Sequence, residues 1–431
     1  MLFQSAKRRV WRWSAPLRRW LCWLIGGSWK RVVAAVALMA ALAGAGAFVL
    51  VSLGLVSISA SSGHWKPTGW LLHYAMRRAV STQSIGIEVP PLDDPALLLK
   101  GAGHYHTGCL ACHGAPGEER SLIVQQMTPE PPYLPPRIEH WAPQELFWIV
   151  KNGVKFTAMP AWPAPKRDDE VWAVVAFLQA MPGMSPERYK ELALGGRSDE
   201  TAKSVTPDHL QPLQDPLGPV LANCNRCHAK DGGGRGEGAF PRLAGQSEPY
   251  LHGALQAYAR GARHSGVMQP IAAGLEPEVL EALAQHYAEL PPVSRTNAPK
   301  PTPDILAQGL SLAERGVPER GVPSCLHCHG PKNGPRNPMY PNIAGQYARY
   351  LKLQLELFTA GKRGGSEYAH IMHSAAQRLT PEQMQALADY YASLPATPVP
   401  AVSTKPSPPL DKPAPTRAGP AAKISSPQQQ R

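Results

Sequence analysis

Three copies of one pentapeptide constrain this chain more than any other feature of its sequence. Six of the seven cysteines belong to the pattern Cys-x-x-Cys-His, which occurs at Cys109–His113, Cys224–His228 and Cys325–His329. Two thiols one helical turn apart can each form a thioether to a vinyl group of a haem, and the adjacent imidazole then reaches the iron from the same side. We therefore expect three covalent haems c, attached through Cys109, Cys112, Cys224, Cys227, Cys325 and Cys328, with His113, His228 and His329 as proximal iron ligands.

Zinc binding and disulfide formation are the alternatives for such cysteines. A tetrahedral zinc site normally combines two cysteine pairs or adds distant histidines, and zinc does not require a His directly after the second Cys. Disulfides also form in exported proteins, but they do not explain the His either. Haem attachment accounts for all five positions of the pattern, so we prefer it. The seventh cysteine, Cys22, lies outside the pattern, and we assign it no role.

An electron-carrying haem needs a second strong axial ligand, and a Met thioether opposite His raises the reduction potential. Met159, Met268 and Met372 follow the motif histidines by 46, 40 and 43 residues. Met159 lies in a segment bounded by Pro160, which favours a loop rather than a helix face. We predict that these three methionines are the distal iron ligands.

Other Met and His residues are weaker candidates for the distal position. Met127 is a rival to Met159, and Met339 has no counterpart elsewhere in the chain. Met384 falls on the apolar face of a predicted helix, where Met more often fills a core. A second His ligand would give a haem of lower potential. The histidines near the proposed ligands, which we expect at the surface or in support of them, are His264, His370 and His373.

The second and third motifs lie in a tandem repeat. The segment Phe240-Pro-Arg-Leu-Ala-Gly-Gln246 recurs as Tyr340-Pro-Asn-Ile-Ala-Gly-Gln346, and the proposed ligands Met268 and Met372 occupy matching positions. Each repeat ends in an apolar stripe with helical spacing, and a similar stripe closes the first motif region. The stripes are Val171, Val174, Val175 and Leu178; Leu280, Leu283, Tyr287 and Leu290; and Met384, Leu387, Tyr391 and Leu394. A capping-box pattern at Thr380 and Gln383 marks the start of the last helix.

An uncharged segment near the N-terminus predicts a membrane anchor. Val32–Val56 is almost wholly apolar, and about 20 residues suffice to cross the hydrocarbon core. Eight basic residues precede it, which places the N-terminus in the cytoplasm and exports the rest of the chain. A cleaved signal peptide is the alternative, but its apolar region is usually only about 7–15 residues long.

The net charge of +12 does not indicate nucleic-acid binding. Eleven basic residues and no acidic ones lie before Glu88, and the remainder of the chain carries 33 basic and 32 acidic residues. A nucleic-acid-binding face needs basic residues clustered on a folded domain. We therefore expect no nucleic-acid partner.

The motif regions resemble the class I c-type cytochromes over about residues 92–396. The first region has Gly108-Cys-Leu-Ala-Cys-His-Gly114-Ala-Pro-Gly117 and Met159-Pro-Ala-Trp162, and it resembles the single-domain cytochrome subunits of respiratory dehydrogenase or oxidase complexes. The second and third share the Ala-Gly-Gln loop and resemble the tandem dihaem cytochromes. The resemblance implies an all-α fold of three class I cytochrome c domains in tandem behind one N-terminal transmembrane helix, and electron transfer without substrate turnover.

These features together predict the organisation of the chain. We expect a basic cytoplasmic segment at 1–31, a transmembrane anchor at 32–56, a periplasmic connector at 57–91, cytochrome c domains at 92–184, 216–292 and 304–397, linkers at 185–215 and 293–303, and a disordered Pro-rich tail at 398–431. The polar linkers suggest adjustable docking of the domains. The Gly-rich charged segment Lys230–Glu237 has no assigned role.

The expected function is electron transfer in a respiratory chain, at the periplasmic face of a bacterial inner membrane. The chain would relay electrons from a quinol-oxidising complex or a dehydrogenase towards a terminal oxidase or a soluble cytochrome. A subunit of an alcohol or sugar dehydrogenase complex is one alternative. A peroxidase-like enzyme with one open iron site is another, but a Met candidate for every haem argues against it.

Overall fold

The computed structural model describes residues 29–195, 217–293, 301–330 and 337–396. Within these ranges the chain is helical, and its only β-structure is two isolated bridges, Ala115 with Glu118 and Val317 with Val322. The predicted all-α class is confirmed. Most of the basic N-terminal segment, Cys22 and the Pro-rich tail lie outside the described residues.

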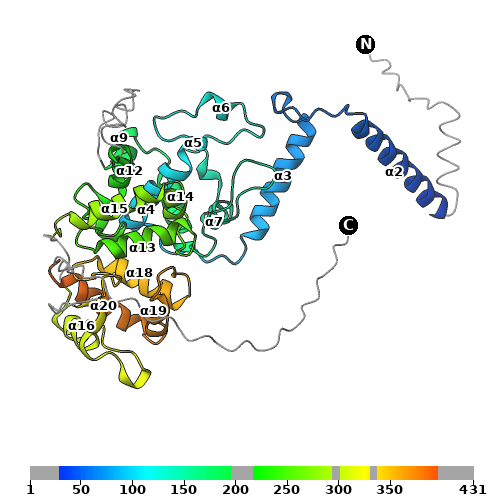
Figure 1. Cartoon of the computed structure of the whole chain (residues 1–431). Coiled ribbons are helices and arrows are strands. Elements are labelled where there is room, and N and C mark those ends of the chain that lie inside the picture. Colours follow the sequence, from blue (N-terminus) through cyan, green and yellow to red (C-terminus); the bar gives the residue numbers. More distant parts are fainter. Residues whose placement is uncertain (1–28, 196–216, 294–300, 331–336, 397–431) are drawn as a thin grey trace, which may run out of the picture.

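Helix α2, Trp29–Ser52, stands apart from the helical body of the molecule (Figure 1). It is long and apolar enough to cross a membrane, and none of its residues is buried. Twenty-four residues at about 1.5 Å each span roughly 36 Å, which exceeds a hydrocarbon core of about 30 Å. The helix ends four residues before the predicted limit of the anchor.

The expected connector is itself largely helical. It contains the 3₁₀ turn η1, Ala60–Ser62, and the 18-residue helix α3, Lys66–Gln83. Helix α3 packs against α7, Pro143–Asn152, and the guanidinium of Arg77 lies 5.2 Å from the ring centroid of Trp141. The connector therefore joins the anchor to the first haem-motif region through a packed helix.

Helices α4 to α9 surround the first motif and form the first unit, residues 95–194. They are α4, Pro95–Gly108; α5, Leu110–His113; α6, Leu122–Gln125; η2, Ile138–His140; α7; α8, Asp168–Ala180; and α9, Pro186–Leu194. Helices α4 and α8 cross most closely, because Gly101 presents no side chain to α8. The predicted apolar stripe of α8 lies in the core.

Helix α9 occupies the start of the segment predicted to be a linker. Its side chains Tyr189, Leu192 and Ala193 are buried in the core of the first unit. Their spacing gives α9 a short apolar face. The charged residues between them make the segment polar in composition, which is why the sequence predicted a linker here. The first unit therefore extends at least to residue 194.

The second unit, residues 218–289, and the third unit, residues 303–393, repeat one arrangement. The second contains α12, Gly218–His228; η3, Gly236–Gly238; α13, Glu248–Ala259; α14, Met268–Ala273; and α15, Pro277–Glu289. The third contains α16, Pro303–Arg315; η4, Pro318–Arg320; α17, Leu326–His329; α18, Ala348–Thr359; α19, Ala369–Ala376; and α20, Pro381–Ser393.

Both predicted closing helices are confirmed, as α15 and α20. Leu280, Leu283 and Tyr287 are buried, as are their counterparts in α20, whereas Leu290 and Leu394 end the two helices. The predicted capping box is present, since Thr380 Oγ1 accepts from Gln383 N at 3.3 Å and Gln383 Oε1 accepts from Thr380 N at 3.0 Å.

The Gly-rich segment Lys230–Glu237 contacts both neighbouring units. Arg235 donates to the carbonyl of Glu191 at 2.9 Å in the first unit, and Tyr347 of the third unit donates to the carbonyl of Gly233 at 2.9 Å. Gly236 also lies against the first unit, since a Cβ there would lie 2.2 Å from Leu99 Cδ2, and glycine permits this close approach because it has no Cβ. The packing thus differs from the adjustable docking that the linkers suggested, because a segment outside the linkers joins the three units.

A Gly101→Ala substitution tests the helix crossing that supports the first motif. A Cβ at Gly101 would lie 1.9 Å from the carbonyl oxygen of Ala173, so the helices must separate. We expect the free energy of unfolding of the variant to fall by about 1–3 kcal/mol. Each kcal/mol should lower the melting temperature of the unit by roughly 4–8 °C, as measured by far-UV circular dichroism. Gly69→Ala in α3, whose Cβ would meet only His64 Cβ at 3.6 Å, is the control and should not destabilise the protein. Equal losses in both variants would contradict this account.

Candidate haem-binding sites

Each motif is a single helical turn with a defined end. The His113 amide donates to the Cys109 carbonyl at 2.9 Å, and the His329 amide donates to the Cys325 carbonyl at 2.9 Å. The next residue leaves the helix at positive φ in every case: Gly114 at 67°, Ala229 at 60° and Gly330 at 70°. The two cysteines of each motif are thus one helical turn apart, with the His directly after the second.

The three motif imidazoles share one hydrogen bond. The Nδ1 atoms of His113, His228 and His329 lie 2.9, 3.1 and 3.0 Å from the carbonyl oxygens of Pro132, Pro241 and Pro341. A carbonyl oxygen only accepts, so Nδ1 carries the proton and Nε2 presents the lone pair. This is how a protein orients an imidazole that binds a metal.

Burial affects the protonation of the motif side chains. Burial lowers the pKa of His113 and of His228, which favours the neutral imidazole that binds iron. Burial, and then the neighbouring Cys112, raise the pKa of the Cys109 thiol to about 12; burial likewise raises the pKa of Cys325 to about 11. Zinc requires thiolates. Among the described residues no three His, Cys, Asp or Glu side chains cluster as a metal site, and the six motif cysteines form no disulfide.

One cavity of about 820 Å³ brings together eight of the predicted residues. Cavities for small molecules are typically about 300–1,000 Å³ and mostly apolar. The walls include Cys224, Cys227, His228, Met268, Cys325, Cys328, His329 and Met372. The three residues of the second unit's buried core cluster, Leu251, Ala284 and Tyr287, also line the cavity, so the cavity borders this core directly. The cradle therefore fits a large flat apolar group.

Buried nitrogen atoms on the cavity wall suit the carboxylates of such a group. His104 Nδ1 and the Nε and Nη1 atoms of Arg226 are buried without a hydrogen-bond partner, and both side chains line the cavity. Burial, reinforced by the charges of Lys100 and Arg167, lowers the pKa of His104 to about 3. A haem carries two propionates, which Arg226 in particular could bind.

The candidates of the first unit do not line this cavity. Cys109 lies between α4 and α5, Cys112 and His113 lie in α5, and Met159 is half-buried in the loop that follows α7. The Met159 amide donates to Thr157 Oγ1 at 3.1 Å, and the Met159 carbonyl accepts from Val154 N at 3.2 Å. The loop expected for Met159 is present, and its ligation stays a prediction.

The local structure around the other two methionines differs from a loop. Met268 begins α14, and Met372 lies within α19. The alanines near each Met favour these short helices. Both side chains nevertheless line the cavity that their motif residues share.

The rival residues divide into three groups. Met384 is 4% exposed in the core of the third unit, as expected for packing. His373 Nε2 donates to the Arg363 carbonyl at 2.6 Å, and His370 Nδ1 donates to the Glu367 carbonyl at 3.1 Å, so both rings support the backbone. His264 and Met339 line the cavity, although Met339 has no counterpart in the repeat.

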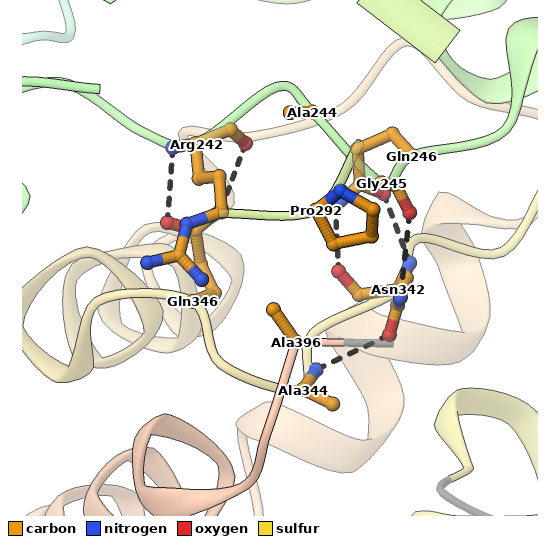
Figure 2. A pocket seen from close by; sticks show the side chains of 9 residues that line it. All are labelled: Arg242, Ala244, Gly245, Gln246, Pro292, Asn342, Ala344, Gln346 and Ala396. Atoms are coloured by element: carbon orange, nitrogen blue, oxygen red, sulfur yellow. Dashed lines mark hydrogen bonds between the residues drawn. The ribbon is translucent and has the colours of Figure 1, made fainter. Parts of the chain in front are cut away.

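Reciprocal hydrogen bonds between glutamine side chains and backbone groups join the second and third units (Figure 2). Gln346 accepts from Arg242 N at 3.1 Å and donates to the Arg242 carbonyl at 2.9 Å. Gln246 accepts from Asn342 N at 2.9 Å and donates to the Asn342 carbonyl at 2.6 Å. Arg242 matches Asn342 in the repeat, and Gln246 matches Gln346, each at an offset of 100. Each unit therefore contacts the other through the same loop.

A second reciprocal pair lies on the cavity wall. Arg263 donates to Tyr350 Oη at 3.3 Å, and Arg363 donates to Tyr250 Oη at 3.4 Å. These four side chains also repeat at an offset of 100 and line the common cavity. The repeat therefore builds a two-fold-like interface between the two proposed sites.

Gln346→Ala tests the importance of this interface. The substitution removes the partner of the buried Arg242 amide and carbonyl, and an unsatisfied buried polar group costs about 1–3 kcal/mol. We expect a loss of this size in denaturant unfolding followed by circular dichroism. The control is Gln285→Ala, which removes only an exposed bond to Glu289 and should change stability by less than about 0.5 kcal/mol. A loss no greater than in the control would contradict the role of Gln346.

Comparisons with known proteins agree with this chemistry. Residues 96–178 match the family model of cytochrome c oxidase, cbb3-type, subunit III, and residues 322–395 match that of cytochrome c. The chain is 38% identical over 187 residues to the thiosulfate dehydrogenase electron acceptor of Thiomonas intermedia (strain K12), which covers 43% of this chain and 85% of the relative. It is 30% identical over 174 residues to cytochrome c4 of Pseudomonas aeruginosa, covering 40% of this chain and 84% of the relative.

A solved structure gives a similar comparison. The crystal structure of reduced recombinant cytochrome c4 from Pseudomonas stutzeri has 30% sequence identity and a TM-score of 0.37, covering 41% of this chain and 95% of that chain. The sequence relationships, together with the helical motifs and their oriented histidines, identify the chain as a member of the class I c-type cytochromes that carries covalent haem c.

Proposed function

We propose that the chain is a membrane-anchored electron carrier with three haems c, one in each helical unit. The observation that supports this most strongly is the shared geometry of the motifs, in which each His donates Nδ1–H to a proline carbonyl. The proposed thioether residues are Cys109, Cys112, Cys224, Cys227, Cys325 and Cys328, and the proposed axial pairs are His113 with Met159, His228 with Met268 and His329 with Met372.

A bound haem supplies an iron that gains or loses one electron. The residues of this chain would hold that iron from both faces, so that no substrate binds to it, and would keep the groups in fixed relative positions. The common cavity supports electron transfer between the second and third units, because it contains both of their proposed sites, and His104 on its wall places the first unit beside it.

We further propose a dehydrogenase as the electron donor and a terminal oxidase as the eventual acceptor. Similarity to an electron acceptor of thiosulfate dehydrogenase favours a donor that oxidises an inorganic sulfur compound. The first unit matches a subunit of a cbb3-type oxidase, which favours this unit as the one that passes electrons to the acceptor. In this arrangement the second and third units receive electrons from the donor. Helix α2 would anchor the chain in the inner membrane, with the helical units in the periplasm.

Reconstitution with a donor tests this assignment. The purified chain in detergent should stay oxidised with thiosulfate alone and become reduced when thiosulfate and a thiosulfate dehydrogenase are both added, as measured by haem absorbance. Reduction by thiosulfate alone would contradict a pure carrier role. No reduction with the enzyme, but rapid reduction by a quinol-oxidising complex, would replace the proposed donor.

Substitution of each proposed distal ligand tests the axial pairs. Changing Met159, Met268 or Met372 singly to Ala should lower the potential of one haem, because the thioether raises it. The same substitution should let carbon monoxide bind that iron in the reduced protein. Potentiometric titration and absorption spectra measure both effects. Met384→Ala, at a core position, is the control and should leave all three potentials unchanged. If a ligand variant leaves all three potentials unchanged, as this control should, the Met that it replaces is not a distal ligand.

A further inference from the structure

Glu170 of the first unit is buried against the segment that precedes Met268 of the second unit. Its side chain lies at the start of α8 and is 2% exposed. One carboxylate oxygen accepts from Ser265 Oγ at 2.8 Å, and the other accepts from the amide of Gly266 at 2.6 Å. Trp162 Nε1 donates to the second oxygen at 3.3 Å. Both oxygens of the Glu170 side chain therefore accept hydrogen bonds, one of them from the neighbouring unit's backbone.

The contact continues from Ser265 to the proposed ligand. Ser265 Oγ accepts from the amide of Met268 at 3.2 Å and from that of Val267 at 3.4 Å. Glu170 is therefore linked to the backbone of Met268 through a single hydroxyl group. Trp162 closes the same contact, because a Cβ at Gly266 would lie 2.2 Å from its ring. Only glycine fits there.

Charged side chains of the first unit hold Glu170 in place. Arg167 lies 3.0 Å from Glu170 Oε1 and also donates to the His264 carbonyl at 2.7 Å. Burial alone would lower the pKa of Arg167, but the hydrogen bonds that it donates to Asp169 and the charge of Glu170 raise this pKa above its ordinary value. Lys100 pairs with Asp169 at 3.1 Å. Two positive and two negative side chains thus form a balanced network around residues 264–266.

The third unit provides an internal comparison. The repeat places Ala369 where the second unit has Ser265, so the segment before Met372 has no equivalent hydroxyl. The Ala369 amide instead donates to the Ser366 carbonyl at 3.1 Å within the same segment. Within the repeat, the serine that links Glu170 to the Met backbone is therefore found in the second unit and not in the third.

We propose that Glu170 is a positioning residue for the distal ligand of the second haem, through which the first unit sets the potential of a haem in the second. The proposal rests on the haem sites of the proposed function. The Met268 backbone must be held for its thioether to meet the iron, and Glu170 and Ser265 hold it from the neighbouring unit. A weakened iron–sulfur bond lowers the potential and opens the iron to other ligands.

Two single substitutions test the proposal in the full-length protein. Glu170→Gln places an amide donor among four donors, and Ser265→Ala introduces the residue found in the third unit. Each should lower one of the three potentials and increase the fraction of reduced haem that binds carbon monoxide, up to one haem in three. Glu145→Gln is the matched control. Glu145 also accepts from a backbone amide of the first unit, at Ala142, but within that unit. This variant should match the wild type, and an unchanged potential in either test variant overturns the proposal.

A double variant identifies the haem that responds. In a Met268→Ala background the iron has already lost the ligand, so Glu170→Gln should add no further shift. In a Met372→Ala background the full shift should remain. Shifts that persist without Met268, or that affect all three haems alike, overturn the proposal.

Haem quantification separates this result from a failure of the proposed function. Fewer than three covalent haems in the wild-type chain would contradict the proposed function itself. Three haems with unaltered potentials in the Glu170→Gln variant would overturn only the role of Glu170.

Discussion

The orientation of three imidazole rings is the constraint on which the rest of the structure depends. The pentapeptide places a His next to its thiols, but it leaves the ring free to rotate about χ1 and χ2. In each unit a proline carbonyl accepts from Nδ1 and fixes that rotation, so that Nε2 faces the site. The loop that carries the proline must therefore pack against the motif helix, and the positive φ directly after each motif lets the chain turn away from the helix.

The small size of each unit explains the contacts between units. A small unit that encloses a large prosthetic group has few side chains left for a core, and its walls must be completed by neighbours. The second unit shows this most clearly. Gln346 satisfies the backbone of Arg242 from one side, and Glu170 satisfies Ser265 and Gly266 from the other. The site in the middle is thus built by three units, which gives both neighbours a means of altering its chemistry.

The sequence predicted those features that depend on local spacing. The motif turns, the closing helices α15 and α20, and the capping box at Thr380 all follow from residues a few positions apart, and all are present. The repeat also contained the signal for the supporting prolines, since Pro241 and Pro341 occupy matching positions beside the proposed sites. Helix α9 was missed because Tyr189 and Leu192 stand among charged residues.

Features that depend on contacts between distant residues could not be predicted in this way. Glu170 lies in the first turn of α8, yet two of its partners, Ser265 and Gly266, lie 95 and 96 positions away. The Gly-rich segment had no recognised role, because only the fold brings Gly236 against Leu99 of the first unit, where a Cβ would lie 2.2 Å from Leu99 Cδ2. Met339 has no repeat partner, but it approaches Gly253 of α13 across the interface. Only the folded arrangement brings these residues together.

The most direct test of the whole account is the haem content and ligand state of the purified full-length chain. The absorption spectrum, with haem quantified per polypeptide and carbon monoxide added to the reduced form, measures both. The account predicts three low-spin haems per chain, none of which binds carbon monoxide. A smaller haem content, or one haem that binds carbon monoxide in the unaltered protein, would contradict it and would favour a site with an open iron position.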